Sequence, residues 1–372
     1  MRKKVLFVTI ALLAAALLTG CAGGAVRGTT WPGLAADDNT AYLADGPYVY
    51  AINLKDGKQL WRYPAASDRN LLFYSTPVVT PDGLVIVGSA GKNNSLIALN
   101  PADINQNTNN INSPAVAWTF NGAKDHWFAA PLVVKDKLFA VNVDGYLYVL
   151  NLTDGQSTKK AVKAIDIGGR LWAQPATDGE RIFLTSLDHS VIAVNVETYE
   201  ALWHEDIEGA VASSAVLGTD GMLYVGSLAS QLERFDPATG SHEPVFKAED
   251  WIWSTPSLDS DTLYFGDLDG NFYSFSTSTG KLNWPPVKPD GPITASPLVL
   301  GDSILIATES GSVYQVSKAG QSKLWSQPGG QIYTTPIQVG DLILVAPLGT
   351  EAYLYAYNQD GSQAWQPFIP QN

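Results

Sequence analysis

Short apolar runs separated by turn residues fill the chain from residue 29 onward. Runs such as 48–52 and 146–150 collect β-branched, aromatic and other apolar residues over about five positions, which favours buried strands over helices. Asp-Gly pairs at 45–46 and 144–145 precede such runs, and their glycines supply the positive φ that two-residue hairpin loops require. The pattern predicts an all-β chain of short strands joined by hairpins.

One unit of this kind recurs eight times at a spacing of about 44 residues. Most copies open near a proline, and most carry a tryptophan after a later turn. These tryptophans are Trp61, Trp118, Trp203, Trp284, Trp325 and Trp365. Four strands at this period are typical of a propeller blade, because one small sheet cannot bury both of its faces alone. We predict one eight-bladed β-propeller of four-stranded antiparallel blades over residues 29–372. Each indole is expected to pack on the next blade and to donate its N–H.

Composition and charge narrow the possible partners. The chain holds 36 acidic and 23 basic residues, for a net charge of -13, which argues against binding nucleic acid because that affinity depends on clustered Lys and Arg. Its single cysteine excludes an intramolecular disulfide and a zinc site built on several thiolates.

Residues 1–20 have the layout of an export signal. Basic residues at 2–4 precede an uncharged stretch, and Leu-Thr-Gly before Cys21 resembles the lipobox of bacterial lipoproteins. The resemblance implies cleavage before Cys21 and acylation of its thiol, with residues 21–28 as lipidated cysteine and tether. By resemblance to enterobacterial lipoproteins, in which an Asp after the cysteine favours retention in the inner membrane, Ala22 permits localisation to the outer membrane. We expect an exported protein anchored by its lipid to the extracytoplasmic face of a bacterial membrane, either inner or outer.

The repeated turn and tryptophan, with an aromatic strand before them, resemble the pyrroloquinoline quinone (PQQ) repeat. Two families share it. Membership of the quinoprotein alcohol dehydrogenases would imply PQQ, calcium, an Asp base and paired cysteines over the cofactor. Membership of the BamB-like lipoproteins would imply a lipid-anchored scaffold in outer-membrane protein assembly. A lipobox, one cysteine and eight copies fit the second family, so PQQ and calcium are not expected as cofactors.

Residues suited to catalysis are scattered along the chain. The four histidines fall in three copies at unlike repeat positions, which argues against a nucleophilic triad: His126, His189, His204 and His242. Residues 267–271 resemble the start of a calcium loop, but Ser278 stands where the bidentate Glu of such a loop belongs. A hairpin turn is the favoured interpretation there. We predict no catalytic and no metal-binding residues, and hence no enzyme.

One aromatic pattern is a candidate for binding. Three residues before the repeated proline, five of seven copies carry an aromatic residue: Tyr74, Phe128, Trp172, Trp253 and Tyr333. Trp127 and Trp251 lie close by, and His126 and Arg170 stand five residues before their prolines. The first strand of a blade is the innermost, so these nine residues are predicted to rim one mouth of the central channel. Such a rim either packs the blades together or binds a peptide, glycan or flat ligand.

Two further features leave alternatives open. Residues 101–115 lengthen one connection, either as a solvated loop or as a lobe that contacts a partner. The ring closes either through whole terminal blades or through residues 24–33 as an outer strand of the last blade. The main hypothesis for function is a non-catalytic scaffold that presents one propeller face to a protein or a cell-envelope polymer. The alternatives are a BamB-like assembly factor and a PQQ-dependent dehydrogenase.

Overall fold

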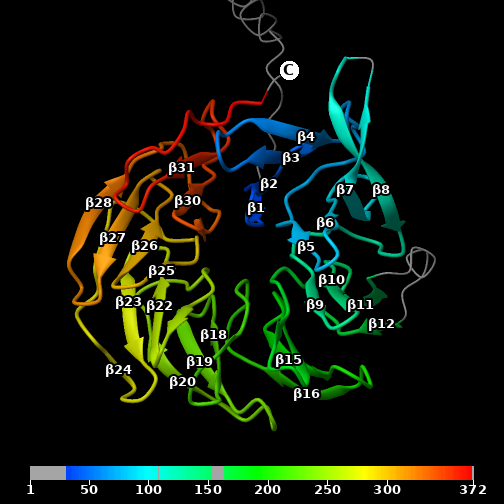
Figure 1. The fold of residues 1–372 in the computed structure, drawn as a ribbon. Helices are drawn as coiled ribbons and strands as arrows, with labels where there is room; N and C mark the ends of the chain where they lie inside the picture. Colours follow the sequence, from blue (N-terminus) through cyan, green and yellow to red (C-terminus); the bar gives the residue numbers. More distant parts are fainter. Residues whose placement is uncertain (1–30, 108, 153–162, 371–372) are drawn as a thin grey trace, which may run out of the picture.

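The computed structural model describes residues 31–107, 109–152 and 163–370. Within these ranges the chain forms 31 β-strands and no helix, so none of their segments is a helix able to cross a membrane. Figure 1 shows the sheets arranged in a ring, with β1 (Gly33–Ala36) toward the central opening. The eight-bladed β-propeller predicted from the repeat is confirmed. The expected signal, Cys21 and tether lie outside the described residues.

Each blade is an antiparallel meander whose strands A to D run from the centre outward. Blades 1 to 4 are β1 to β4 (Gly33–Ala36, Thr40–Asp45, Tyr48–Asn53, Gln59–Tyr63), β5 to β8 (Val78–Val79, Val85–Gly88, Leu96–Gln106, Asn112–Phe120), β9 to β12 (Leu132–Val134, Lys137–Val141, Tyr146–Asn151, Lys163–Asp166) and β13 to β16 (Ala176–Thr177, Arg181–Thr185, Ser190–Asn195, Ala201–Asp206).

Blades 5 to 8 are β17 to β20 (Val216–Leu217, Leu223–Gly226, Gln231–Phe235, His242–Lys247), β21 to β24 (Ser257–Asp259, Thr262–Gly266, Phe272–Ser276, Lys281–Leu282), β25 to β28 (Leu298–Leu300, Ser303–Ala307, Val313–Ser317, Ser322–Ser326) and β29 to β31 (Ile337–Val339, Leu342–Val345, Tyr355–Tyr357). Blade 8 has three regular strands. Its fourth position is taken by isolated bridges, Tyr357 with Gln363 and Leu354 with Phe368.

The middle strands of each blade are buried on both faces, because a neighbouring blade covers each side. The B strand β6 and the C strand β23 are buried along their whole lengths, whereas the D strand β16 is largely exposed. This explains why the B and C strands read as nearly continuous apolar runs rather than as alternating ones. The core is therefore a set of clusters between successive blades.

The ring closes by packing between two whole blades. One cluster joins Leu43 and Ile52 of blade 1 to Leu344 and Leu354 of blade 8. The indole N–H of Trp365 also donates to the Leu54 carbonyl of blade 1 at 3.1 Å. The outer position of blade 8 is occupied by its own residues Gln363 and Phe368, which supports closure through whole terminal blades; residues 24–30 of the second alternative lie outside the described residues.

The repeated tryptophan packs over the turn glycine of the following blade. An added Cβ on that glycine would lie 2.5 to 2.9 Å from the indole or backbone of the preceding blade's tryptophan. The pairs are Trp203 with Gly240, Trp284 with Gly320, Trp325 with Gly361, and Trp365 with Gly57. Each glycine also has positive φ. A side chain at this position is therefore disfavoured both by the backbone conformation and by the contact with the tryptophan.

Indole N–H groups complete some of these contacts. Trp203 donates to the Pro237 carbonyl at 3.0 Å, and Trp325 donates to the Gln359 carbonyl at 3.2 Å. Trp61 is buried in the cluster between blades 1 and 2, and Trp118 in the cluster between blades 2 and 3. The N–H groups of Trp118 and Trp284 are buried without a partner among the described residues.

The insertion in blade 2 is an ordered hairpin, so the expectation of a solvated loop over 101–115 was wrong about its conformation. Strands β7 and β8 continue outward past a bulge, with Ile104 opposite Pro114 and Gln106 opposite Asn112. Figure 1 shows this hairpin projecting from the rim of the ring. The Asn112 amide donates to the Leu60 carbonyl of blade 1 at 3.3 Å, which fixes the tip beside β4. Whether the hairpin contacts a partner stays a prediction.

A matched pair of glycine substitutions tests the contact between tryptophan and turn. Gly280→Ala should cost about 1 kcal/mol of unfolding free energy, because Gly280 has φ +65° but nothing within 4 Å of its added Cβ. Gly240→Ala should cost about 3 kcal/mol, because its Cβ would meet the Trp203 ring at 2.9 Å in addition. Urea denaturation measures both, and equal losses would contradict the packing role of the indole.

Candidate ligand-binding site at the channel mouth

The segment that enters each innermost strand alternates between two environments. Four residues before the proline, or before Ala215 in its place, the side chain is buried between blades in the seven copies that the structure describes at this position: Phe73, Trp127, Leu171, Val211, Ile252, Ile293 and Ile332. Three residues before it, the side chain is partly exposed toward the channel in most copies, including Trp172 and Trp253. The extended backbone explains this, since successive side chains point to opposite sides.

The predicted aromatic residues touch one another around the mouth. Tyr74 stacks on Phe128 with ring centroids 6.5 Å apart, and Phe128 lies 5.0 Å from Trp172. Trp253 and Tyr333 also lie at the mouth, but their ring contacts with the other aromatic residues run through a residue that was not part of the predicted rim. We call Tyr74, Phe128, Trp172, Trp253 and Tyr333 the aromatic collar.

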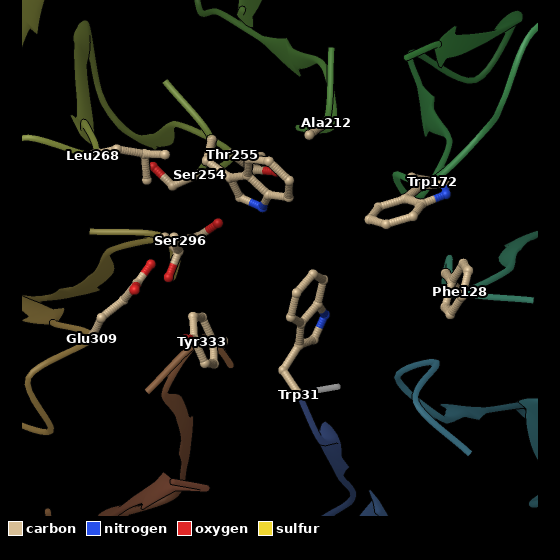
Figure 2. Close-up of a pocket in the computed structure, with 12 residues that line it drawn as sticks. Trp31, Phe128, Trp172, Ala212, Ser254, Thr255, Leu268, Ser296, Glu309 and Tyr333 are labelled. Carbon is tan, nitrogen blue, oxygen red and sulfur yellow. The ribbon is translucent and has the colours of Figure 1, made fainter. Parts of the chain in front are cut away.

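That joining residue is Trp31, at the entrance to blade 1. Its ring centroid lies 6.4 Å from Trp172, 6.4 Å from Trp253 and 5.8 Å from Tyr333. It stands directly before Pro32, where the other copies carry Thr76, Ala130, Gln174, Ser214, Thr255, Ser296 and Thr335. An indole in place of these smaller side chains reaches the centre of the mouth (Figure 2). This contrast between copies was the sequence signal that could have identified Trp31.

A pocket of about 350 Å³ opens between Trp31 and the collar. Its aromatic lining is Trp31, Phe128, Trp172, Trp253 and Tyr333, and the remaining lining residues are Ala212, Ser254, Thr255, Leu268, Thr294, Ser296 and Glu309. Figure 2 shows the Glu309 carboxylate beside Ser296, on the same side of the pocket as Tyr333. Burial raises the pKa of Glu309, although the hydroxyls of Thr294 and Tyr333 oppose that effect. Glu309 is the one acidic residue in this lining, which contains no basic residue.

The other predicted rim residues lie apart from the pocket. The His126 ring stacks on Phe128 at 5.7 Å and pairs with Asp125 at 2.5 Å. Arg170 is exposed, and Trp251 is 48% exposed beside the collar.

Trp127 requires a correction. It is 1% exposed and packs between blades 2 and 3, with its indole N–H donating to the Asn94 carbonyl at 2.8 Å. It occupies the buried position four residues before the proline, so comparison with Leu171 and Ile252 in the sequence indicates a core residue.

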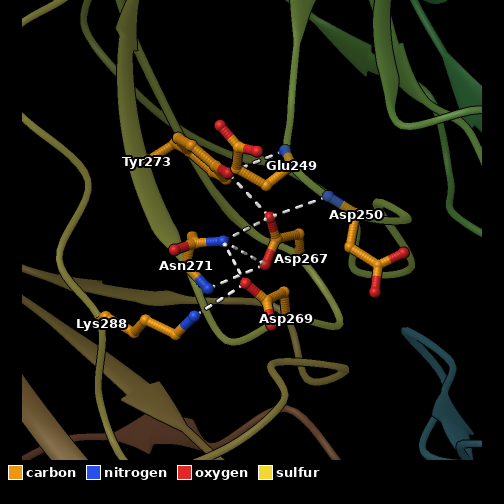
Figure 3. Close-up of polar contacts among 7 residues, drawn as sticks. All are labelled: Glu249, Asp250, Asp267, Asp269, Asn271, Tyr273 and Lys288. Carbon is orange, nitrogen blue, oxygen red and sulfur yellow. Dashed lines mark hydrogen bonds and ion pairs between the residues drawn. The ribbon is translucent and has the colours of Figure 1, made fainter.

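The turn that resembles a calcium loop is a hairpin held by a buried carboxylate (Figure 3). Asp267 is 0% exposed and accepts hydrogen bonds from the Tyr273 hydroxyl at 2.7 Å and the Asn271 backbone at 2.8 Å. The Asn271 amide and the Asp250 backbone N–H also donate to it. Lys288 pairs with Asp269 at 2.7 Å. The turn joins β22 to β23, as the hairpin interpretation predicts.

Histidine and acidic side chains of the described residues lie in pairs rather than in larger clusters. His242 lies 3.4 Å from Glu233, a buried acid whose pKa is raised by burial, and His204 lies 3.7 Å from Asp206 on the exposed strand β16. Among the described residues, no group of three or more His, Cys, Asp or Glu side chains is placed to hold a metal ion.

Comparison with known proteins identifies the family. A family model described as outer membrane protein assembly factor BamB matches residues 22–243 and 158–367, which together span nearly the whole chain. The chain belongs to the BamB family. The resemblance inferred from the repeats is thereby confirmed.

Individual BamB relatives are distant. The chain is similar to BamB of Shewanella oneidensis, with 26% identity over 211 residues, or 52% of this chain and 51% of the relative. It is similar to BamB of Yersinia pestis, with 23% identity over 293 residues, or 77% and 71% of the two chains. The chain thus spans about half the length of the first relative and more of the second.

Solved structures agree on the fold. BamB of Moraxella catarrhalis superposes with a TM-score of 0.66 at 19% identity, over 87% of this chain and 92% of the other. The computationally designed protein Ika8 superposes with a TM-score of 0.69 at 11% identity, over 91% and 96%. Because a designed protein matches the fold as well as a BamB structure does, the fold alone does not specify the function.

Two acidic residues of one turn in this BamB-family propeller provide a test of its buried network. Asp267→Ala should lower the free energy of unfolding by about 3 kcal/mol, because it leaves buried donors of Asn271 and Tyr273 without an acceptor. Asp269→Ala should have a much smaller effect, since its carboxylate is exposed. Chemical denaturation compares the two variants, and an equally small loss for both would contradict the role given to Asp267.

Proposed function

We propose that this protein is a non-catalytic scaffold in the assembly of outer-membrane proteins. The observation that carries the proposal is the BamB family match, which extends through the whole propeller rather than over a few blades. The relatives from Shewanella oneidensis and Yersinia pestis are named as assembly factors of this kind. Of the functions considered from the sequence, the BamB-like alternative is therefore favoured over an unspecified cell-envelope scaffold.

The propeller has physical properties that suit a scaffold. Clusters between blades and tryptophans over turn glycines join all eight blades, so loops on one face keep fixed positions. We place the partner surface on the face that carries the channel mouth. Trp251 is half exposed there next to the collar, and exposed aromatic residues are common anchors in protein interfaces.

The proposed location is the extracytoplasmic side of the outer membrane, with Cys21 as the lipidated residue. The family match begins at residue 22, directly after this cysteine. This supports cleavage before Cys21 and a mature chain whose first residue is that cysteine. We also propose that the protein works without PQQ or calcium. A rise in melting temperature on adding both, together with dye-linked oxidation of alcohols or sugars, would contradict this and favour a dehydrogenase.

Replacement of the cysteine tests the anchor. Cys21→Ala should abolish incorporation of labelled fatty acid, because the cysteine sulfur is the atom that receives the lipid. The variant should also move from the membrane fraction to the soluble fraction. Thr19→Ser, which keeps a small residue near the cleavage site, is the matched control and should retain the label. Unchanged labelling of Cys21→Ala would exclude lipidation at this residue.

Deletion of the gene in the source bacterium tests the assembly role. We expect a several-fold loss of folded β-barrel proteins from the outer membrane, measured by heat-modifiable migration in gels. Re-expression of the wild type should restore them. Unchanged barrel levels would contradict the proposal.

Cross-linking in cells locates the partner surface. A photoreactive amino acid at position 251 should capture a protein of the barrel-assembly machinery, whereas one at Glu180, exposed on a turn between strands A and B, should not. Capture at Glu180 and not at Trp251 would place the partner on the other face.

A further inference from the structure

The pocket at the channel mouth combines two features that attract positive charge. Rings from five different blades surround it, and Trp31 contacts Trp172, Trp253 and Tyr333 at centroid distances of 5.8 to 6.4 Å. Glu309, from the turn between β26 and β27, adds a carboxylate to the same cavity. Aromatic faces carry the negative end of the ring quadrupole, so such a cage attracts a cation placed over them.

We propose that this pocket binds an organic cation, either an ammonium or a guanidinium group. The inference rests on the pocket alone and not on the assembly role, so each can fail without the other. The ligand's charge would lie between Glu309 and the ring faces of Trp31, Trp253 and Tyr333.

The lining favours a cation over an anion or a neutral group. It holds no Lys, Arg or His, while Glu309 is its one acidic residue. The net charge of -13 adds an attractive field for positive ligands. Burial already disfavours the ionised form of Glu309, which raises its pKa, and a bound cation would compensate that cost.

The size of the pocket agrees with such a ligand. At about 350 Å³, it lies at the small end of typical ligand cavities and accommodates one charged head group with an alkyl stem. The partial exposure of Trp31, at 36%, leaves one wall open to solvent. A head group can therefore enter while the rest of the ligand stays outside. Both a basic side chain of a peptide and a small quaternary amine have this shape.

The test uses the mature protein, purified from its host in a non-ionic detergent, and isothermal titration calorimetry. The probes are two cations and their neutral isosteres: arginine amide with citrulline amide, and choline with 3,3-dimethylbutanol. We expect at least one cation to bind about tenfold more tightly than its isostere, since the isostere keeps the shape and loses the charge. Equal affinity of cation and isostere in both pairs, or no binding of either cation, would overturn the proposal.

The two pairs also distinguish the source of the cation. Preference for arginine amide over citrulline amide assigns the pocket to a peptide side chain. Preference for choline over 3,3-dimethylbutanol assigns it to a small quaternary amine or a lipid head group.

Variants locate the binding. Glu309→Gln should weaken the preferred cation about tenfold and leave its isostere unaffected, and Tyr333→Leu should weaken the cation as well. Glu180→Gln removes the same charge from an exposed turn and is the matched control, which should bind as the wild type does. Circular dichroism checks that each variant is folded. If Glu309→Gln binds the cation like the wild type, the site proposed here is wrong.

Discussion

Packing between neighbouring blades is the constraint on which the rest of this structure depends. A four-stranded sheet has two apolar faces, and each must be covered by the next sheet. The tryptophan at the outer strand of one blade lies over the turn glycine of the next, as Trp203 lies over Gly240. The same contact between Trp365 and Gly57 joins the last blade to the first, so an interaction seen at four of the blade junctions also contributes to closing the ring.

A rigid ring holds the side chains at its channel mouth in fixed positions. Because the innermost strands converge on the axis, side chains that are distant in sequence meet there, as Trp31 and Tyr333 do. The rings of the collar contact one another, and four of them, Phe128, Trp172, Trp253 and Tyr333, line a pocket together with Glu309.

Function follows from the surface and not from the fold. The BamB family and a designed propeller share this architecture, so eight blades by themselves specify no activity. In this chain two buried acidic residues have structural roles. Asp267 accepts hydrogen bonds within a hairpin turn, and Glu233 pairs with His242. Glu309 differs from both because it faces a cavity.

The sequence by itself determined the repeat, the strands and the eight-bladed ring, because these depend on local periodicity and on turn glycines that recur in every copy. It also indicated which position of each copy faces the channel. The tertiary structure decided what meets at the axis. Trp31 reaches the centre of the mouth, Trp127 lies in the core, and residues 101–115 form a hairpin against blade 1. These outcomes depend on contacts between different blades, and a pattern within one copy carries no information about which side chain of another copy will lie opposite.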